Sequence, residues 1–230
     1  MALPIYLAQT PAEMAGNPLP GKTAYMACHF SPGGQGLSNL PELLPPGSIL
    51  ILDDSMPMDG HNAELIVSQI ALLHHRHRFD ALLLDFQRAD IPEQQALAAV
   101  LAHAFPFPVG VSELYAGDLS CPVFLPPVPP DNLLSEYLAP WQGREIWLEA
   151  ALDGVTLTLT EAGCSAAPLF DFPGDGLSDE TRHCHYSIET DADSAVFRLW
   201  RTTPDLDALL TEAETLGVTQ AIGLWQELVH

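Results

Sequence analysis

The chain has 230 residues, of which 47% are apolar, and its formal net charge is −22. This apolar content excludes a largely disordered chain, which lacks the apolar surface needed to offset the entropy lost on folding. Thirty acidic residues against eight basic ones repel nucleic-acid phosphates and anionic lipid headgroups, so we expect neither nucleic acid nor a membrane as a partner.

Short apolar segments recur along the chain and alternate with segments of helical periodicity. Continuous apolar runs are typical of strands buried on both faces, as in parallel sheets covered by helices. Eight candidate strands cover residues 3–8, 23–30, 48–52, 80–86, 108–113, 121–125, 145–150 and 220–226. Apolar residues at helical spacing predict helices at residues 62–77, 92–105, 133–141 and 204–216.

This alternation of strand and helix indicates βαβ units and therefore an α/β fold. Eight strands in that order favour a closed (β/α)8 TIM-type barrel over an open sheet, and the chain length suits one barrel of roughly 200–250 residues. We expect residues 1–230 to form a single barrel domain.

Residues 152–202 do not follow this alternation of strand and helix. Polar and apolar residues alternate at 155–161, 184–189 and 195–200, which is typical of half-exposed antiparallel strands. The segment 162–183 is rich in Pro, Gly and Asp, and we expect a loop there. The pattern predicts a small antiparallel insertion after the seventh strand.

The fourth candidate strand reads Asp-Ala-Leu-Leu-Leu-Asp-Phe-Gln over residues 80–87. It resembles a degenerate form of the strand-four signature of glycoside hydrolase family 18, Asp-Gly-x-Asp-x-Asp-Trp-Glu. Asp80 and Asp85 match the first and third aspartates, Leu83 replaces the second, and Gln87 replaces the catalytic glutamate. The insertion after strand seven and the tryptophan of the last strand also fit the family.

This resemblance implies a carbohydrate ligand and a role for Asp85 beside the reacting sugar. In the family, the glutamate protonates the leaving oxygen while the substrate's acetamido group attacks with help from the third aspartate. A glutamine cannot donate a proton as a carboxylic acid does. If the resemblance holds, either catalysis is lost and sugar binding remains, or another carboxylate supplies the proton.

In a βα barrel the functional residues lie at the carboxyl ends of the strands and in the loops that follow. The candidate catalytic residues at these positions are Asp53, Asp54, Asp85, Glu113 and Glu149. The candidate substrate-binding residues are Tyr25, His29, Gln87, Trp225 and Glu227. Such carboxylates suit proton transfer and charge stabilisation in glycoside hydrolysis.

Simpler structural roles remain open for several of these residues. Asp53 or Asp54 could cap the next turn, Trp225 could pack in the barrel, and Asp85 could bond a loop backbone. The run of histidines at 74–77 lies near a helix C-terminus, where cationic side chains favour the helix dipole.

Location and cofactors follow from what the sequence lacks. The N-terminus has no basic segment followed by an apolar run, and no window reaches the roughly 20 apolar residues of a membrane span. The four cysteines, at 28, 121, 164 and 184, fit no zinc spacing. We expect a cytoplasmic protein with reduced thiols, no metal and no cofactor.

Three functions therefore remain open. The first is a glycosidase-like barrel that binds an oligosaccharide, with Asp85 stabilising charge and Glu149 or Glu113 as the acid. The second is a non-catalytic scaffold that binds a sugar or a partner protein. The third is a metal-dependent hydrolase that uses His29 and the strand-end aspartates.

Overall fold

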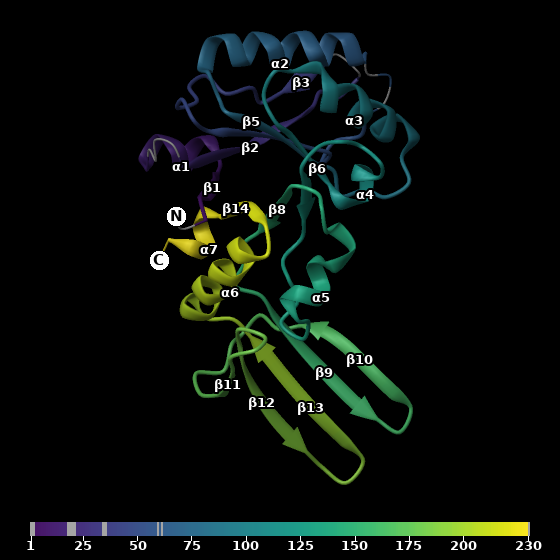
Figure 1. Cartoon of the computed structure of the whole chain (residues 1–230), viewed down its shortest axis with the longest axis vertical. Helices are drawn as coiled ribbons and strands as arrows, with labels where there is room; N and C mark the ends of the chain where they lie inside the picture. Colours follow the sequence, from purple (N-terminus) through teal and green to yellow (C-terminus); the bar gives the residue numbers. More distant parts are fainter. Residues whose placement is uncertain (1–2, 18–21, 34–35, 59, 61, 230) are drawn as a thin grey trace.

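The computed structural model describes residues 3–17, 22–33, 36–58, 60 and 62–229. Eight parallel strands close into a barrel (Figure 1), because β1 pairs with both β14 and β2. In order around the barrel they are β1 (Ile5–Gln9), β2 (Thr23–Phe30), β4 (Ile49–Asp53), β5 (Ala81–Asp85), β6 (Val109–Ser112), β7 (Val123–Leu125), β8 (Ile146–Glu149) and β14 (Val218–Leu224). The TIM-type barrel and all eight predicted strands are confirmed.

Helices connect most of the strands and cover the outside of the barrel. They are α1 (Pro11–Gly16), α2 (Ala63–His77), α3 (Pro92–Ala104), α4 (Glu113–Ala116), α5 (Leu134–Leu138), η1 (Ala139–Trp141), α6 (Thr203–Thr215) and α7 (Trp225–Leu228). A short strand, β3 (Leu37–Ser38), adds antiparallel to β2. In the described part of the chain, no helix is both long and apolar enough to cross a membrane.

Three of the four predicted helices are present as α2, α3 and α6, and the starts of α2 and α6 follow from local chemistry. Helix α2 begins after Asn62, whose side chain accepts hydrogen bonds from two backbone N–H groups of the first turn. Helix α6 begins at a capping box between Thr202 and Asp205. The segment predicted as one helix at 133–141 is instead α5 followed by the 3-10 turn η1, with Pro140 in the first turn of η1, where its missing N–H does no harm.

The barrel interior is filled by side chains and is not a pore. Trp147 on β8 lies across Gly110 on β6, where a Cβ atom would approach the indole ring to 2.4 Å. Around it pack the inward-facing residues of the other strands, which are Ala8, Ala24, Ile49, Ile51, Ala81, Leu83, Phe124 and Ile222. The interior is therefore closed beneath the mouth of the barrel.

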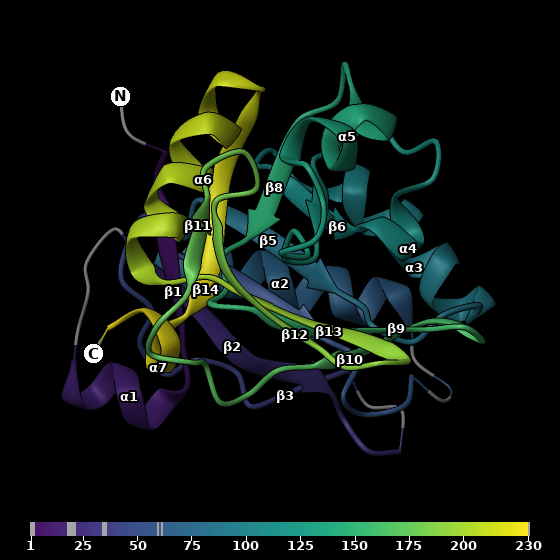
Figure 2. The same ribbon diagram turned by 90° about the horizontal axis from the view of Figure 1, so that it is seen from below.

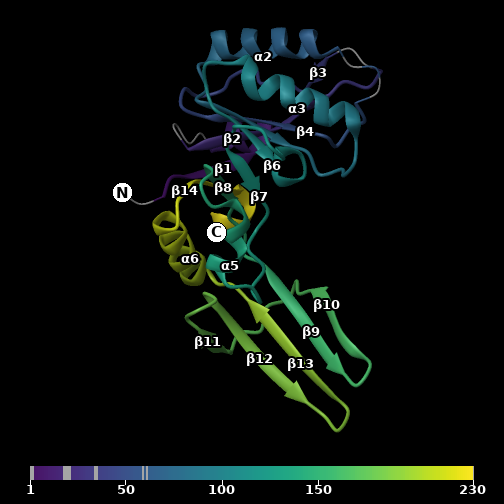
Figure 3. The same ribbon diagram turned by 45° about the vertical axis from the view of Figure 1, so that its right-hand side comes forward.

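A separate five-stranded antiparallel sheet follows β8 and projects away from the barrel (Figures 1 and 3). Its strands are β9 (Gly154–Thr160), β10 (Gly163–Pro168), β11 (Leu177–Asp179), β12 (Cys184–Thr190) and β13 (Ser194–Trp200). Figure 2 views the molecule from the end at which this sheet lies, with α6 and α5 on either side of β8 and β14. The predicted antiparallel insertion is confirmed.

The expected loop at 162–183 is wrong in part, because β10 and β11 lie inside it. β10 consists of small residues and one proline, and all six are exposed, so no large apolar residue recurs at every second position to reveal the strand. β11 has three residues at the edge of the sheet. Exposed edge strands of this kind lack the period-two pattern by which a strand is recognised.

Candidate active site at the barrel mouth

Strand register brings three predicted site residues together. His29 on β2 pairs with Asp53 on β4, and Asp53 pairs with Asp85 on β5. Residues that are partners across neighbouring strands point to the same face of a sheet. Because Ile51 and Leu83, two residues earlier, lie inside the barrel, Asp53 and Asp85 also point inward, at the carboxyl ends of their strands.

A cavity of about 150 Å³ lies at this mouth. Its polar walls are Asp53, Asp85 and Glu149, from three different strands. Its apolar walls are Ala8, Met26, Ile51, Leu83, Phe124, Ile222, Gly223 and Leu224. Among these lining residues none is basic, so the carboxylates share one hollow without a counter-charge from its walls.

Glu149, the last residue of β8, has the most perturbed acidity of the group. Burial raises its pKa to about 7, with further contributions from the negative charges of Asp85, Glu227 and Asp153. A buried carboxylate beside other carboxylates favours its neutral form. Glu149 is therefore protonated up to near neutral pH and can act as a general acid there.

The pKa of Asp85 depends on both burial and a hydrogen bond. Burial raises its pKa, the amide of Gln87 opposes this by donating a hydrogen bond, and the charges of Asp53 and Asp54 raise it further. The amide donates to Oδ1 of Asp85 and thereby stabilises and orients the carboxylate. Gln87 thus acts on the site through Asp85.

Asp54 lies just outside this group, although it is adjacent to Asp53 in sequence. It is 3% exposed, and its Oδ1 and Oδ2 accept hydrogen bonds at 3.0 Å from the backbone N–H groups of Gln87 and Arg88. Gln94 donates a third, at 3.1 Å. Asp54 therefore holds the loop between β5 and α3, which carries Gln87. Asp53 also accepts a backbone hydrogen bond, from Ser55 at 2.8 Å, while it lines the cavity.

Glu113 lies at the edge of a second, smaller hollow of about 80 Å³, which shares Phe124 and Glu149 with the first. Tyr137, on α5, belongs to the same neighbourhood. Burial raises its pKa, and the charges of Glu113 and Glu149 add to the effect. Its hydroxyl donates to the carbonyl of Pro126 at 2.9 Å. The sequence gives no signal for Tyr137, because it occurs within an ordinary amphipathic helix.

The four remaining predicted residues do not line either hollow. Tyr25 packs between β2 and the outer helices and donates a hydrogen bond to the carbonyl of Asn39 at 2.7 Å. The prediction that Tyr25 faces the mouth is therefore wrong. His29 makes a ring-nitrogen contact of 3.1 Å with the carbonyl of Ala27. Trp225 is half-buried and Glu227 is exposed in α7, directly after β14. The negative charge of Glu227 contributes to the raised pKa of Glu149.

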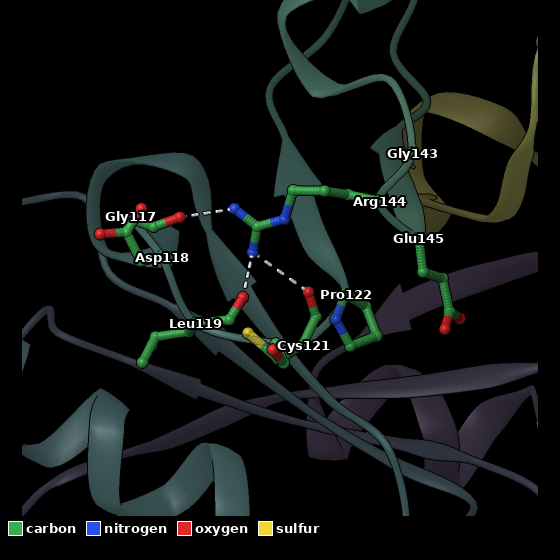
Figure 4. Close-up of a pocket in the computed structure, with 9 residues that line it drawn as sticks. Gly117, Asp118, Leu119, Cys121, Pro122, Gly143, Arg144 and Glu145 are labelled. Carbon is green, nitrogen blue, oxygen red and sulfur yellow. Dashed lines mark hydrogen bonds between the residues drawn. The ribbon is translucent and has the colours of Figure 1, made fainter.

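A metal centre and a second large hollow are the alternatives to a site at the mouth. Among the described residues, no group of three or more His, Cys, Asp or Glu side chains is placed to hold a metal ion. A hollow of about 490 Å³ lies at the opposite, amino-terminal end of β7 and β8 (Figure 4). There Arg144 donates to the carbonyls of Gly117, Leu119 and Cys121 at 2.7, 2.6 and 3.3 Å. Its guanidinium joins two loops, which is a structural role typical of the amino-terminal face of a βα barrel.

Comparison with known proteins supports the fold. No protein-family model and no curated protein matches the chain. The spore cortex-lytic enzyme SleL of Bacillus cereus superposes with a TM-score of 0.57 and 11% identity over 96% of this chain and 70% of its own. A chitinase of Chromobacterium violaceum superposes with a TM-score of 0.57 and 9% identity over 96% and 93%. At such identities the likeness shows the fold alone, a closed eight-stranded βα barrel.

Proposed function

We propose that this protein is a glycosidase-like barrel that binds a carbohydrate at the mouth and hydrolyses a glycosidic bond there. The observation that carries the proposal is the pairing of Glu149, with a pKa raised to about 7, with Asp85 in one cavity. Neighbouring carboxyl groups of different acidity are the pair that glycoside hydrolysis requires.

Glu149 donates its proton to the oxygen of the leaving sugar as the glycosidic C–O bond breaks. Asp85 stabilises the positive charge that develops on the ring. Water then adds to the anomeric carbon and returns a proton to Glu149, which restores the site. The amide hydrogen bond of Gln87 favours the ionised form of Asp85 and orients its carboxylate.

Two independent likenesses indicate the class of carbohydrate. The motif at residues 80–87 resembles glycoside hydrolase family 18, and one structural neighbour is a chitinase. Both favour a glycan built from N-acetylated sugars. Chito-oligosaccharides are therefore the first ligands to try.

The test is a thermal-shift screen of the wild type against chito-oligosaccharides and other glycans, followed by a reducing-end assay with each ligand that shifts the transition. A ligand that binds only the native state at 100 times its dissociation constant adds about 2.7 kcal/mol. We expect a shift with one sugar class and turnover that decreases above about pH 7, where Glu149 loses its proton.

Variants then locate the activity. Glu149→Gln and Asp85→Asn should abolish turnover, whereas Glu161→Gln, on the exposed turn between β9 and β10, should keep it. Absence of any shift and any turnover across the panel would overturn the proposal.

A non-catalytic sugar-binding barrel is the second candidate, and Gln87 at the position of the family's catalytic glutamate is the observation that favours it. It predicts the same ligand-dependent shift without turnover. The reducing-end assay separates the two functions.

A further inference from the structure

The antiparallel sheet is attached to the barrel only at its base. There Arg201, 1% exposed, donates to the carbonyls of Val128 and Pro129, and His183 and His185 contact Glu212 and Asp205 of α6. Beyond this base the sheet extends away from the barrel, and no helix of the described chain lies against either of its faces (Figures 1 and 3).

Strand register divides the sheet into two chemically different faces. Leu157 on β9 pairs with Phe197 on β13, which pairs with Ile188 on β12. Alternate residues on each side of this central row share its face. This apolar face consists of Val155, Leu157, Leu159, Cys164, Ala166, Pro168, Leu177, Tyr186, Ile188, Thr190, Ala195, Phe197 and Leu199.

None of these thirteen residues is charged, although the chain has a net charge of −22. At the base the same face also carries Asp179, which pairs with Cys184. The opposite face is polar and carries Thr156, Thr158, Ser187 and the Arg198–Glu189 ion pair. At the base the apolar face continues to Cys184, which is buried and lies 3.5 Å from the carbonyl of Pro130. Only its outer part is uncovered.

Several members of the face are strongly exposed. The exposed fractions are 42% for Leu159, 48% for Ile188 and 62% for Leu177. In the described part of the chain, none of the residues of the apolar face belongs to a hydrophobic core cluster. A contiguous exposed apolar surface of this kind is typical of an interface.

We propose that the apolar face packs against the same face of a second copy of this chain, forming a two-sheet sandwich. Four strands about 20 Å long and the three-residue β11, about 10 Å long, present roughly 430 Å² per copy at a strand spacing of about 4.8 Å. The pair then covers about 900 Å², the order of a weak, reversible interface. Two antiparallel sheets that each have one apolar face bury them in this way.

One arrangement of two copies keeps their acidic tips apart. The tips of the sheet carry Glu161, Asp191 and Asp193. A two-fold axis along the central row places Leu157 and Phe197 against their own copies and sends the two acidic tips to opposite ends. There they are farther apart than the Debye length of about 8 Å at physiological salt, so repulsion between them is screened.

The test is the mass of the full-length chain by sedimentation velocity up to about 100 µM, a concentration that detects a weak dimer. We expect a dimer. The double variant Leu159→Ser/Ile188→Ser removes two exposed side chains and should raise the dimer dissociation constant at least tenfold. Val196→Ser is the matched control, because Val196 lies on the polar face beside Phe197, and it should leave the constant unchanged.

Both substituted residues are more than 40% exposed in the monomer, so the double variant should fold, which circular dichroism verifies. A wild type that stays monomeric throughout would overturn the proposal and leave a different partner as the occupant of the face. Equal effects of the double variant and Val196→Ser would also overturn it. Salt gives an independent check: a dimer that dissociates between about 0.05 and 0.5 M NaCl is held by charge, contrary to the proposal.

Discussion

Replacing Glu149 by glutamine should stabilise the protein, and more so at high pH. Burial and neighbouring carboxylates raise the pKa of Glu149 from 4.5 to about 7. The folded chain holds this proton more tightly than the unfolded chain. Below about pH 4.5 Glu149 is protonated in both states and does not lower the free energy of unfolding. Between about pH 4.5 and 7 its ionisation lowers the free energy of unfolding progressively. At about 1.4 kcal/mol per unit of pKa, the full cost is about 3 kcal/mol.

Glutamine has the same shape as the protonated acid and never ionises. Glu149→Gln should therefore exceed the wild type in free energy of unfolding by about 3 kcal/mol at about pH 8, and by only about 1 kcal/mol at about pH 5.5. Lower pH is avoided because the isoelectric point is about 4.4, where a protein without net charge associates and precipitates.

Urea unfolding of both chains at the two pH values measures these differences. Glu161→Gln, at an exposed turn, is the control and should show no such change with pH. A stability difference between Glu149→Gln and the wild type that is the same at both pH values would refute the reasoning, because it would show that Glu149 does not bind its proton more tightly in the folded state.

Three further substitutions test the scaffold by urea unfolding or hydrogen exchange. Asp54→Ala leaves three N–H donors without their acceptor and should lower the free energy of unfolding by at least about 2 kcal/mol. An unchanged stability would show that Asp54 does not hold the loop. Gly110→Ala drives a methyl group into Trp147 and should cost about 1–3 kcal/mol, whereas Gly174→Ala, with open space around it, should change stability by less than about 0.5 kcal/mol. Arg201→Met should speed amide exchange of the antiparallel sheet while the barrel keeps its protection, and a uniform loss would contradict its role at the base of the sheet.

The strands of the barrel could be predicted because each contains a short apolar segment, and β4 and β5 are aliphatic up to their last residue. The ends of those runs also gave the acidic mouth, since Asp53, Asp85 and Glu149 directly follow apolar residues. Sequence fails where a side chain's face depends on local geometry. In regular β-structure Tyr25 and His29 would share a face, but the register of β2 shifts between Tyr25 and Cys28 and turns Tyr25 outward.

Roles within the mouth could not be predicted either, because they depend on distances across the barrel. Asp53 and Asp54 are indistinguishable as neighbours in sequence, yet one lines the cavity and the other is buried among loop N–H groups. They differ because Asp53 is the last residue of β4 and points inward, whereas Asp54 is the first residue after the strand. Tyr137 joins the site only because α5 folds back over Pro126.

The glutamine at position 87 is consistent with catalysis once the charges of the mouth are considered together. Asp53, Asp85 and Glu149 line one cavity, and none of the described residues lining it is basic. A glutamate at position 87 would add another negative charge beside Asp85, whereas the amide of Gln87 donates a hydrogen bond to it. The amide favours the ionised form of Asp85, and that charge raises the pKa of Glu149. An acid and a charge stabiliser are distinguished by their different acidities. Under the proposed function the acid lies on β8 and not in the loop after β5.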